Sequence, residues 1–194
     1  SNFTLHGMSV HLRLPGLYNV ENALAAVLTA KELGVSEDKA WKAVSNVAFV
    51  PGRLERVDLG QPWEVIVDYA PEPESLKQLY GLLRTAPSGR LIHVLGSCGG
   101  GRDVARRPIL GRMAGETADI VVVTNEDPYD DDPREIMEMI AKGAEEVGKR
   151  REQDLFLVQD RAEAIQFAMK QAKSGDRVLM TGKGAERWIC EANG

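Results

Sequence analysis

The strongest constraint on the fold is a repeated alternation between short, wholly apolar runs and longer amphipathic stretches. The runs have the length and composition of strands buried on both faces of a parallel sheet; they are residues 65–67, 91–95, 120–123, 155–158 and 178–180. The stretches between them have helical spacing; they are residues 74–84, 107–117, 133–147 and 161–173. Asp160 as an N-cap and Pro133 in a first turn support two of these helix starts. Strands and helices that alternate about every 30 residues predict an α/β, doubly wound, mostly parallel sheet with right-handed crossovers.

The chain before these runs is organised differently. Its predicted elements are strand fragments over 3–5 and 10–14, a helix over 19–33 closed by Gly34, and a helix capped by Ser36 that ends near residue 46. Two strand fragments and two helices do not make a domain by themselves. We therefore expect residues 1–50 to be the tail of a preceding domain and residues 51–194 to form a second domain.

Composition narrows the class of protein. The 194 residues are 43% apolar and 27% charged, as is ordinary for a globular chain. The 24 basic and 29 acidic side chains leave a net charge of −5, which argues against a nucleic-acid partner. No signal-peptide pattern is present, and no apolar run approaches the ~20 residues that cross a bilayer. Cys98 and Cys190 are too few for a disulfide framework and lack metal-ligand spacing, so we expect a cytoplasmic chain that holds no metal itself.

The carboxyl ends of the predicted strands carry polar loops, which is where ligands gather in a doubly wound sheet. After residues 91–95, clustered glycines free main-chain N–H groups to face an anion, and Arg102, Arg106 and Arg107 add carboxylate or phosphate forks. The segment matches neither GxGxxG nor GxxxxGK[ST], so neither nucleotide fingerprint is met. It predicts an anion site, with a flexible loop and solvated arginines as the alternative.

Two further loops are charged. The loop after residues 120–123 is acidic, with Glu126, Asp127, Asp130, Asp131 and Asp132. It is either a solvated loop or a site for an ammonium group or a metal ion. After residues 178–180, Gly182-Lys183-Gly184 lets the main chain approach a ligand, while Lys183 and Glu186 offer opposite charges.

Other residues that can carry chemistry have structural interpretations. Asp68, after residues 65–67, predicts an Asx-type turn ahead of a helix. Cys98 is interpreted as a small loop residue and Cys190 as a buried small hydrophobe. His93 lies inside a predicted strand, so we expect it to be structural.

Taken together and in this order, these motifs resemble those of the Mur ligases, specifically the MurE type, the UDP-N-acetylmuramoyl-dipeptide–amino-acid ligases. The resemblance covers almost the whole chain. The matching segments are Asn19-Val20-Glu21-Asn22-Ala23-Leu24-Ala25-Ala26, Pro51-Gly52-Arg53-Leu54-Glu55, Asp68-Tyr69-Ala70, Gly99-Gly100-Gly101-Arg102-Asp103 with Arg107-Pro108, Glu126-Asp127-Pro128-Tyr129 and Gly182-Lys183-Gly184-Ala185-Glu186. Pro71 and Ala185 stand where the family has histidine, and Tyr129 stands where its Asp-Asn-Pro-Arg motif has arginine.

The resemblance implies part of a ligase of peptidoglycan synthesis, and so of cell wall biogenesis, cell shape and cell division. Residues 51–194 would be the family's Rossmann-like, amino-acid-binding C-terminal domain, and residues 1–50 the end of its central, ATP-binding domain. In this family the terminal carboxylate of UDP-N-acetylmuramoyl-L-Ala-D-Glu is phosphorylated, and the amine of a free amino acid then displaces phosphate to form an amide. The implied cofactors are ATP and Mg²⁺.

The same resemblance implies a role for each matching residue. Asn19 and Asn22 would lie against the adenine, and Arg53 and Asp68 would close over the phosphates and the ribose. The amino-acid pocket would be lined by Arg102, Glu126, Asp127, Pro128, Tyr129, Gly182 and Glu186. The family's phosphate loop, Mg²⁺ ligands and carbamylated lysine belong upstream, so we expect no catalytic residue or metal ligand here and no turnover by this chain alone. We expect no membrane insertion, and a monomer is the default expectation.

The amino acid added would be a diamino acid, namely lysine, ornithine or meso-diaminopimelate. Family members that use meso-diaminopimelate bind its distal carboxylate with the arginine that Tyr129 replaces. Because the surrounding loop is acidic, the sequence favours a side chain that ends in an ammonium alone. Arg102 and Glu186 are retained, and Arg102 could still pair with a distal carboxylate.

Two alternatives remain open. One is a non-catalytic Rossmann-like binding module that kept the fold without ligase chemistry. The other is a sister amide ligase of the MurF or folylpolyglutamate type, which would not be expected to carry Arg102, residues 126–129 and Glu186 jointly.

Overall fold

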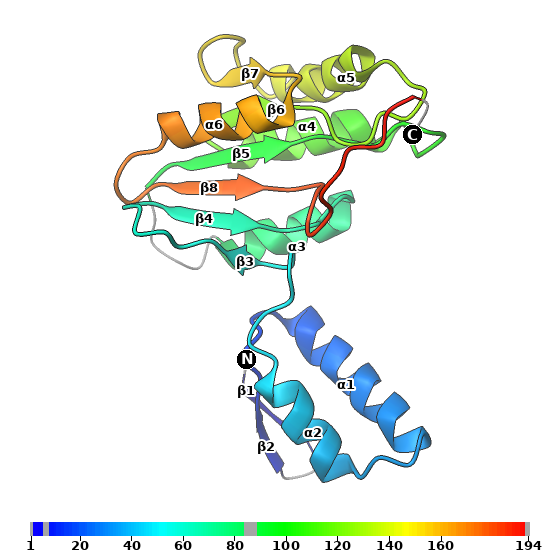
Figure 1. The fold of residues 1–194 in the computed structure, drawn as a ribbon. Helices are drawn as coiled ribbons and strands as arrows, with labels where there is room; N and C mark the ends of the chain where they lie inside the picture. Colours follow the sequence, from blue (N-terminus) through cyan, green and yellow to red (C-terminus); the bar gives the residue numbers. More distant parts are fainter. Residues whose placement is uncertain (1, 6–7, 84–88, 193–194) are drawn as a thin grey trace. The chain divides into compact units, whose positions relative to one another are not determined.

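The computed structural model describes residues 2–5, 8–83 and 89–192. It divides into two compact units, Ser1–Val50 and Pro51–Gly194 (Figure 1). Each unit has a hydrophobic core of its own. Across the described residues, no helix combines the length and the apolar character that crossing a bilayer would require.

The first unit pairs a small sheet with two helices. Its elements are β1 (Asn2–Leu5), β2 (Met8–His11), α1 (Leu17–Glu32) and α2 (Glu37–Asn46). The strands are antiparallel, and Trp41 is buried in a core between the sheet and the helices. Gly34, at φ +86°, follows the end of α1 as predicted. Ser36 occupies the N-cap position of α2 without a side-chain bond, and the strand predicted over 10–14 ends at His11.

The second unit is built on a six-stranded sheet. Its strands are β3 (Glu55–Arg56), β4 (Glu64–Val67), β5 (Leu91–Leu95), β6 (Ile120–Val123), β7 (Leu155–Leu157) and β8 (Arg177–Met180). They lie in the order β3-β4-β8-β5-β6-β7, and only β3 pairs antiparallel with its neighbour. The five strands predicted from apolar runs are confirmed. β3 gives no sequence signal, because two residues cannot show a periodicity.

Helices cover both faces of this sheet (Figure 1). They are α3 (Pro73–Leu83), α4 (Arg106–Thr117), α5 (Pro133–Glu145) and α6 (Arg161–Gln171). Helices α3, α4 and α5 share one core with Ile66 and Leu95, whereas α6 packs on the other face with Ile92 and Val122. This is the doubly wound α/β architecture that the alternating pattern predicts.

The predicted helix starts are confirmed, whereas some ends differ. Asp160 Oδ1 accepts a hydrogen bond from Glu163 N at 2.8 Å, and Pro133 is the first residue of α5. Helices α5 and α6 each end two residues before the predicted end. The end of the helix predicted over 74–84 falls on residue 84, which lies outside the described residues.

The order of the strands decides which side chains can meet. From β4 the chain passes to β5, β6 and β7, and α6 then carries it back so that β8 lies between β4 and β5. The parallel strands all end on one side of the sheet, here termed the carboxyl edge, and begin on the other, the amino edge (Figure 1). Loops that are distant in sequence therefore converge at the carboxyl edge.

Candidate functional site

Four loops meet at the carboxyl edge. They are residues 68–72 after β4, 96–105 after β5, 124–132 after β6 and 181–186 after β8. The loop after β8 bonds to both neighbouring strand ends: Thr181 N donates to Val94 O at 3.0 Å, and Gly182 N donates to Tyr69 O at 2.8 Å. The structure thus brings together the loops in which the sequence places the amino-acid pocket.

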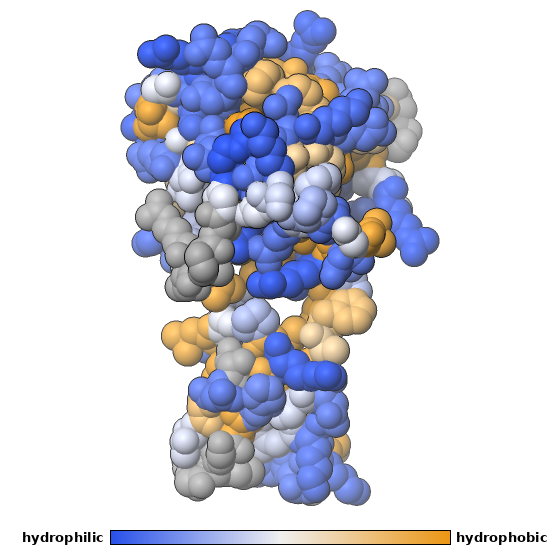
Figure 2. All heavy atoms as spheres, turned by 90° about the vertical axis from the view of Figure 1, so that its left-hand side faces the viewer, coloured by the Kyte–Doolittle hydropathy of each residue, from blue (hydrophilic) through white to orange (hydrophobic). Residues whose placement is uncertain are grey.

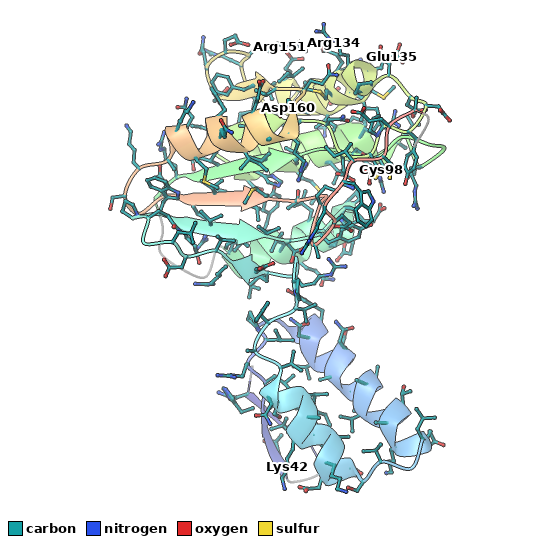
Figure 3. The ribbon with its side chains drawn as sticks, viewed as in Figure 1. Lys42, Cys98, Arg134, Glu135, Arg151 and Asp160 are labelled. Carbon is teal, nitrogen blue, oxygen red and sulfur yellow. The ribbon has the colours of Figure 1, made fainter. Side chains whose placement is uncertain are left out.

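Glu126 lies beneath this surface rather than on it. Its side chain is 1% exposed, and its Oε1 accepts a hydrogen bond from Cys98 Sγ at 2.9 Å (Figure 3 labels Cys98). Gly182, at φ +87°, covers it so closely that a Cβ there would overlap Glu126 Oε2. Burial raises the pKa of Glu126, against the hydrogen bond from Cys98 and the charge of Arg161. Burial and the nearby Glu126 in turn raise the pKa of the Cys98 thiol to about 12.

Asp127 is fully engaged within the protein. Both of its carboxylate oxygens lie 2.6 Å from Lys183 Nζ, and Oδ1 also accepts a hydrogen bond from Cys190 N at 2.8 Å. The pair joins the loop after β6 to the loop after β8, and little of either side chain is exposed. The sequence predicts that Lys183 offers its charge to a ligand, whereas the structure pairs that charge with Asp127.

Pro128 and Tyr129 complete this corner. Pro128 is buried, and Tyr129 has the left-handed φ of +51°. Tyr129 N donates to Cys190 O at 3.0 Å, and its ring lies against Gly100, where a Cβ would come 2.7 Å from the ring. The Tyr129 side chain is 37% exposed, so it can contact a ligand at this edge.

The three arginines that follow β5 do not act alike. Arg106 is buried and donates to Ser97 Oγ at 3.2 Å and to the carboxylate of Glu72. Arg107 is also buried and donates to Asp131 Oδ2 at 2.9 Å. Arg102 alone among the three is exposed. Arg106 and Arg107 therefore bind carboxylates of the protein itself and hold the loop together. For Arg102, binding to an anionic ligand stays a prediction.

The acidic loop is not an open cluster of carboxylates. Beyond Glu126 and Asp127, Asp131 pairs with Arg107, and Asp132 Oδ1 caps α5 by accepting from Arg134 N at 2.8 Å. Asp130 is exposed. Among the described residues, no three His, Cys, Asp or Glu side chains gather as a metal site would need. Two of the five carboxylates, those of Asp127 and Asp131, are paired with cations of the protein, so less of the loop's charge is available to a ligand than the sequence suggests. The site for an ammonium group or a metal ion stays a prediction.

The remaining predicted pocket residue on the loop after β8 is Glu186. It is exposed, and its Oε2 accepts a hydrogen bond from Gly184 N at 2.7 Å. Gly52, at φ +65°, approaches this loop so closely that a Cβ would overlap the main chain of Gly184 and Ala185. The segment that carries Arg53 is thereby fixed against the loop that carries Glu186.

Arg53 and Asp68 have different settings. The Arg53 guanidinium lies over the Tyr69 ring, 4.6 Å from its centroid, and the residue is exposed. Asp68 is 8% exposed, and its two oxygens accept from Leu54 N at 2.7 Å and from Ala70 N at 2.9 Å. Burial raises the pKa of Asp68 against these two bonds. Asp68 therefore fixes the turn beside Arg53, and the Asx-type turn predicted for it is confirmed.

Asn19 and Asn22 lie in the first unit. Asn19 is the third residue of α1, and its Nδ2 donates to Pro15 O at 2.7 Å. Asn22 is exposed one turn further along the same helix. The two amides therefore lie near the start of α1.

His93 and Cys190 were given structural interpretations. His93 is buried between Tyr80 OH, 2.7 Å from its Nδ1, and Thr181 Oγ1, 2.9 Å from its Nε2. Burial lowers the pKa of His93 to about 3, so it is neutral at ordinary pH, and the structural interpretation is confirmed. Cys190 is half-buried, so the interpretation of a buried small hydrophobe is wrong. Its segment runs along the surface beside Tyr129 rather than through the core.

Comparison with known proteins decides the family. Residues 52–184 match the family model described as "Mur ligase, glutamate ligase domain". The chain belongs to the Mur ligase family. The resemblance found in the sequence is therefore confirmed, together with the α/β fold that it implies.

Individual Mur ligases match over nearly the whole chain. The UDP-N-acetylmuramyl-tripeptide synthetase of Roseiflexus sp. (strain RS-1) is 45% identical over 175 residues, which are 90% of this chain and 34% of that protein. The UDP-N-acetylmuramoyl-L-alanyl-D-glutamate--2,6-diaminopimelate ligase of Syntrophomonas wolfei is 39% identical, over 97% of this chain and 38% of that protein. A solved structure of a ligase with the latter name is 32% identical with a TM-score of 0.65, over 95% of this chain and 37% of that one.

The chain thus spans about a third of the length of the curated Mur ligases that it matches. The family match covers all four loops of the carboxyl edge except the last residues of the loop after β8. The four loops of the carboxyl edge therefore belong to a Mur ligase domain, and they lie in the second unit, whereas Asn19 and Asn22 lie outside the match.

Proposed function

We propose that this chain is the C-terminal part of an ATP-dependent ligase that adds a diamino acid to UDP-N-acetylmuramoyl-L-Ala-D-Glu during peptidoglycan synthesis in the cytoplasm. The observation that carries the proposal is the match of 90–97% of the chain to proteins named as tripeptide synthetase or diaminopimelate ligase. Residues 51–194 are proposed as the amino-acid-binding domain. Residues 1–50 are proposed as the end of the central ATP-binding domain.

The reaction proposed is amide formation through an acyl phosphate. ATP supplies the phosphoryl group that activates the carboxylate, and the amine of the amino acid then displaces phosphate, a far better leaving group than hydroxide. The exposed Arg53 fits a phosphate contact, since its guanidinium is held over Tyr69 and keeps free donors. Asn19 and Asn22 are proposed to contact the adenine. Asp68 acts through the turn it fixes, because main-chain N–H groups engage both of its oxygens.

Mg²⁺ is the family's second cofactor, and the residues that the structure describes do not fit a site for it. Among the described residues no group of three metal-ligating side chains is present, and two carboxylates of the acidic loop, Asp127 and Asp131, pair with Lys183 and Arg107. We propose that the Mg²⁺ ligands belong to the rest of the full-length protein. This chain then contributes binding and positioning.

The amino acid is proposed to bind at the carboxyl edge. Arg102 is assigned to a carboxylate of the amino acid, and Glu186 to an ammonium, since both side chains are exposed there. Tyr129 and the Gly182 main chain border the same surface. Glu126, Asp127 and Pro128 support this surface from below rather than contact the ligand.

The side chain of the added amino acid is proposed to end in an ammonium without a second carboxylate, as in lysine or ornithine. Tyr129 offers no cation, and both oxygens of Asp127 already accept from Lys183. Neither residue can therefore neutralise the charge of a distal carboxylate, as the arginine of a meso-diaminopimelate site does. In a competition assay on the full-length protein, a tenfold preference for meso-diaminopimelate would overturn this assignment.

The proposed function is tested with the full-length protein, ATP, Mg²⁺ and UDP-N-acetylmuramoyl-L-Ala-D-Glu. We expect phosphate release that depends on a diamino acid, and a product whose mass equals that of the muramoyl dipeptide plus the diamino acid minus water. Release that is independent of a diamino acid would contradict the proposal. The 194-residue chain alone is expected to release no phosphate above a buffer blank, since it carries no GxxxxGK[ST] loop to hold the γ-phosphate.

A further inference from the structure

Arg161 is a buried arginine that the proposed function does not use. It is the first residue of α6, and its side chain lies under the sheet's carboxyl edge with 9% of the residue exposed. Its guanidinium donates to two main-chain carbonyls: Nη1 to Asn125 O at 3.3 Å and Nη2 to Thr181 O at 2.8 Å. A buried guanidinium whose donors end on main-chain carbonyls fixes the backbone rather than one side chain.

The two carbonyls belong to different loops. Asn125 follows β6 and Thr181 follows β8, and β5 lies between these strands in the sheet. Arg161 therefore spans a strand that it does not bond to and joins the ends of its two neighbours. The loop from Asn125 continues into residues 126–129, and the loop from Thr181 continues into 182–186. Apart from Arg102, every proposed residue of the amino-acid pocket lies on one of these two loops.

The positive charge of Arg161 also affects Glu126 and Asp127, which lie on the loop after β6. It lowers the pKa of Glu126, which burial raises, and Glu126 and Asp127 in turn favour the charged guanidinium. A buried carboxylate without a nearby cation is costly. Glu126 packs directly beneath Gly182. The Arg161 guanidinium therefore stabilises Glu126 under the site as well as the two loops that border it.

We propose that Arg161 is a positioning residue that holds the loops after β6 and β8 in register for the amino acid. This inference rests on the proposed function, because the loops matter through the ligand they receive. Arginine is needed for its two separated donors. Lysine keeps the charge but offers one compact ammonium, which cannot reach both carbonyls in the same way.

The chain offers a matched control at the opposite edge. Arg177 begins β8, is 5% exposed, donates Nη1 to Leu83 O at 2.8 Å and pairs with Glu64. Arg161→Lys and Arg177→Lys both remove a buried guanidinium that bonds to a main-chain carbonyl. Only the first change touches the carboxyl edge.

The first arm of the test is amide hydrogen exchange on the 194-residue chain. In Arg161→Lys we expect roughly tenfold or faster exchange at Asn125 N, bonded to Gln159 O, and at Gly182 N, bonded to Tyr69 O. In Arg177→Lys the acceleration should appear instead at Glu64 N, which bonds to Asp176 O at the amino edge. The same pattern in both variants would mean a general loss of stability and would overturn the proposal.

The second arm is kinetics on the full-length protein. Arg161→Lys is expected to raise KM for the diamino acid roughly 10- to 100-fold, as small displacements of positioning groups do, with KM for ATP changed less than about twofold. Arg177→Lys should change neither constant by more than about twofold. Equal losses for both substrates, or no change in Arg161→Lys, would overturn the proposal. If the unaltered full-length protein needs no diamino acid, the proposed function fails, while the exchange pattern still decides whether Arg161 joins the loops.

Discussion

The amino edge and the carboxyl edge of the sheet differ in how completely their buried charged groups are paired. At the amino edge, Asp176 accepts from Arg90 N at 2.9 Å, from Arg90 Nη2 at 2.7 Å and from Lys173 N at 2.9 Å. Arg177 at the same edge pairs with Glu64. Figure 2 looks at this side and shows hydrophilic side chains over most of the second unit. The charges here are paired and close the end of the sheet.

The carboxyl edge holds its buried charge with incomplete pairing. Among the described residues, two charged side chains at this edge keep a buried atom without a hydrogen-bond partner, namely Glu126 Oε2 and Arg107 Nε. At the amino edge the corresponding atom belongs to an uncharged side chain, Trp63 Nε1. Burial raises the pKa of both Glu126 and Asp68 at the carboxyl edge. Polar groups that are buried without full partners cost stability, and such groups concentrate where a ligand binds. This difference supports the proposal that the carboxyl edge receives a ligand.

The largest effect should separate two glycines at the two ends of β8. Gly182 and Gly175 both have a left-handed φ, +87° and +85°, but a Cβ would overlap Glu126 at Gly182 and meet nothing within 4 Å at Gly175. Gly182→Ala should cost about 2–5 kcal/mol, from backbone strain and overpacking together. Gly175→Ala should cost about 1–2 kcal/mol from strain alone. Urea denaturation measures the free energy of unfolding of both variants. Equal losses of stability would show that the close packing of Gly182 against Glu126 contributes nothing.

A smaller effect should show that an ion pair holds the carboxyl edge together. Asp127→Asn leaves Lys183 buried without its counter-charge, and we expect a loss of about 1.5–3 kcal/mol. The control is Glu146→Gln, which breaks an exposed pair with Arg112 and should cost less than about 0.5 kcal/mol. If both variants unfold at the same urea concentration, the Asp127 pair is no more than a surface contact.

The smallest effect concerns pH, and its sign should differ between the edges. The pKa of Glu126 is raised above its ordinary 4.5, so its contribution to stability is present at low pH and is lost as pH rises through the raised value. Glu126→Gln, which does not titrate, should therefore gain stability relative to the unaltered chain as pH rises above the ordinary 4.5. Measuring urea midpoints at a series of pH values checks the sign.

Asp176 provides the opposite case. Burial would raise its pKa, but hydrogen bonds from Arg90 and Lys173 outweigh burial and lower it below the ordinary 3.8. Its contribution is present above that value and is lost as pH falls through the lowered one. Asp176→Asn should therefore lose most stability, relative to the unaltered chain, near neutral pH and least in acid. The same sign for both variants would contradict the comparison.

Much of the fold could be predicted because the parallel strands are buried on both faces. The run 120–123 is wholly apolar for that reason, and the strand predicted there has the same first and last residues as β6. β3 could not be predicted, because its two residues, Glu55 and Arg56, owe their place to pairing with β4 rather than to any pattern of their own.

The site could be predicted only in part. The rule that ligands gather where parallel strands end grouped the right loops. The state of each charge could not be predicted, because the partner lies far along the chain. Lys183 neutralises Asp127 from 56 residues away, and Arg107 neutralises Asp131 from 24. Arg161 gave no signal either, since its acceptors are main-chain carbonyls, which every residue has.

Arg102 is the residue on which the proposed amino-acid site depends most, since its guanidinium is proposed to bind a carboxylate of the amino acid. The direct measurement is kcat/KM for the diamino acid in the full-length protein with Arg102→Ala. The control is Arg151→Ala, which removes an exposed arginine paired with Glu138 (Figure 3 labels Arg151). We expect kcat/KM for the diamino acid to fall roughly 10- to 150-fold in Arg102→Ala, with KM for ATP nearly unchanged, and to fall no more than about twofold in Arg151→Ala. Equal losses in the two variants, or an equal rise of both KM values in Arg102→Ala, would contradict this role of Arg102.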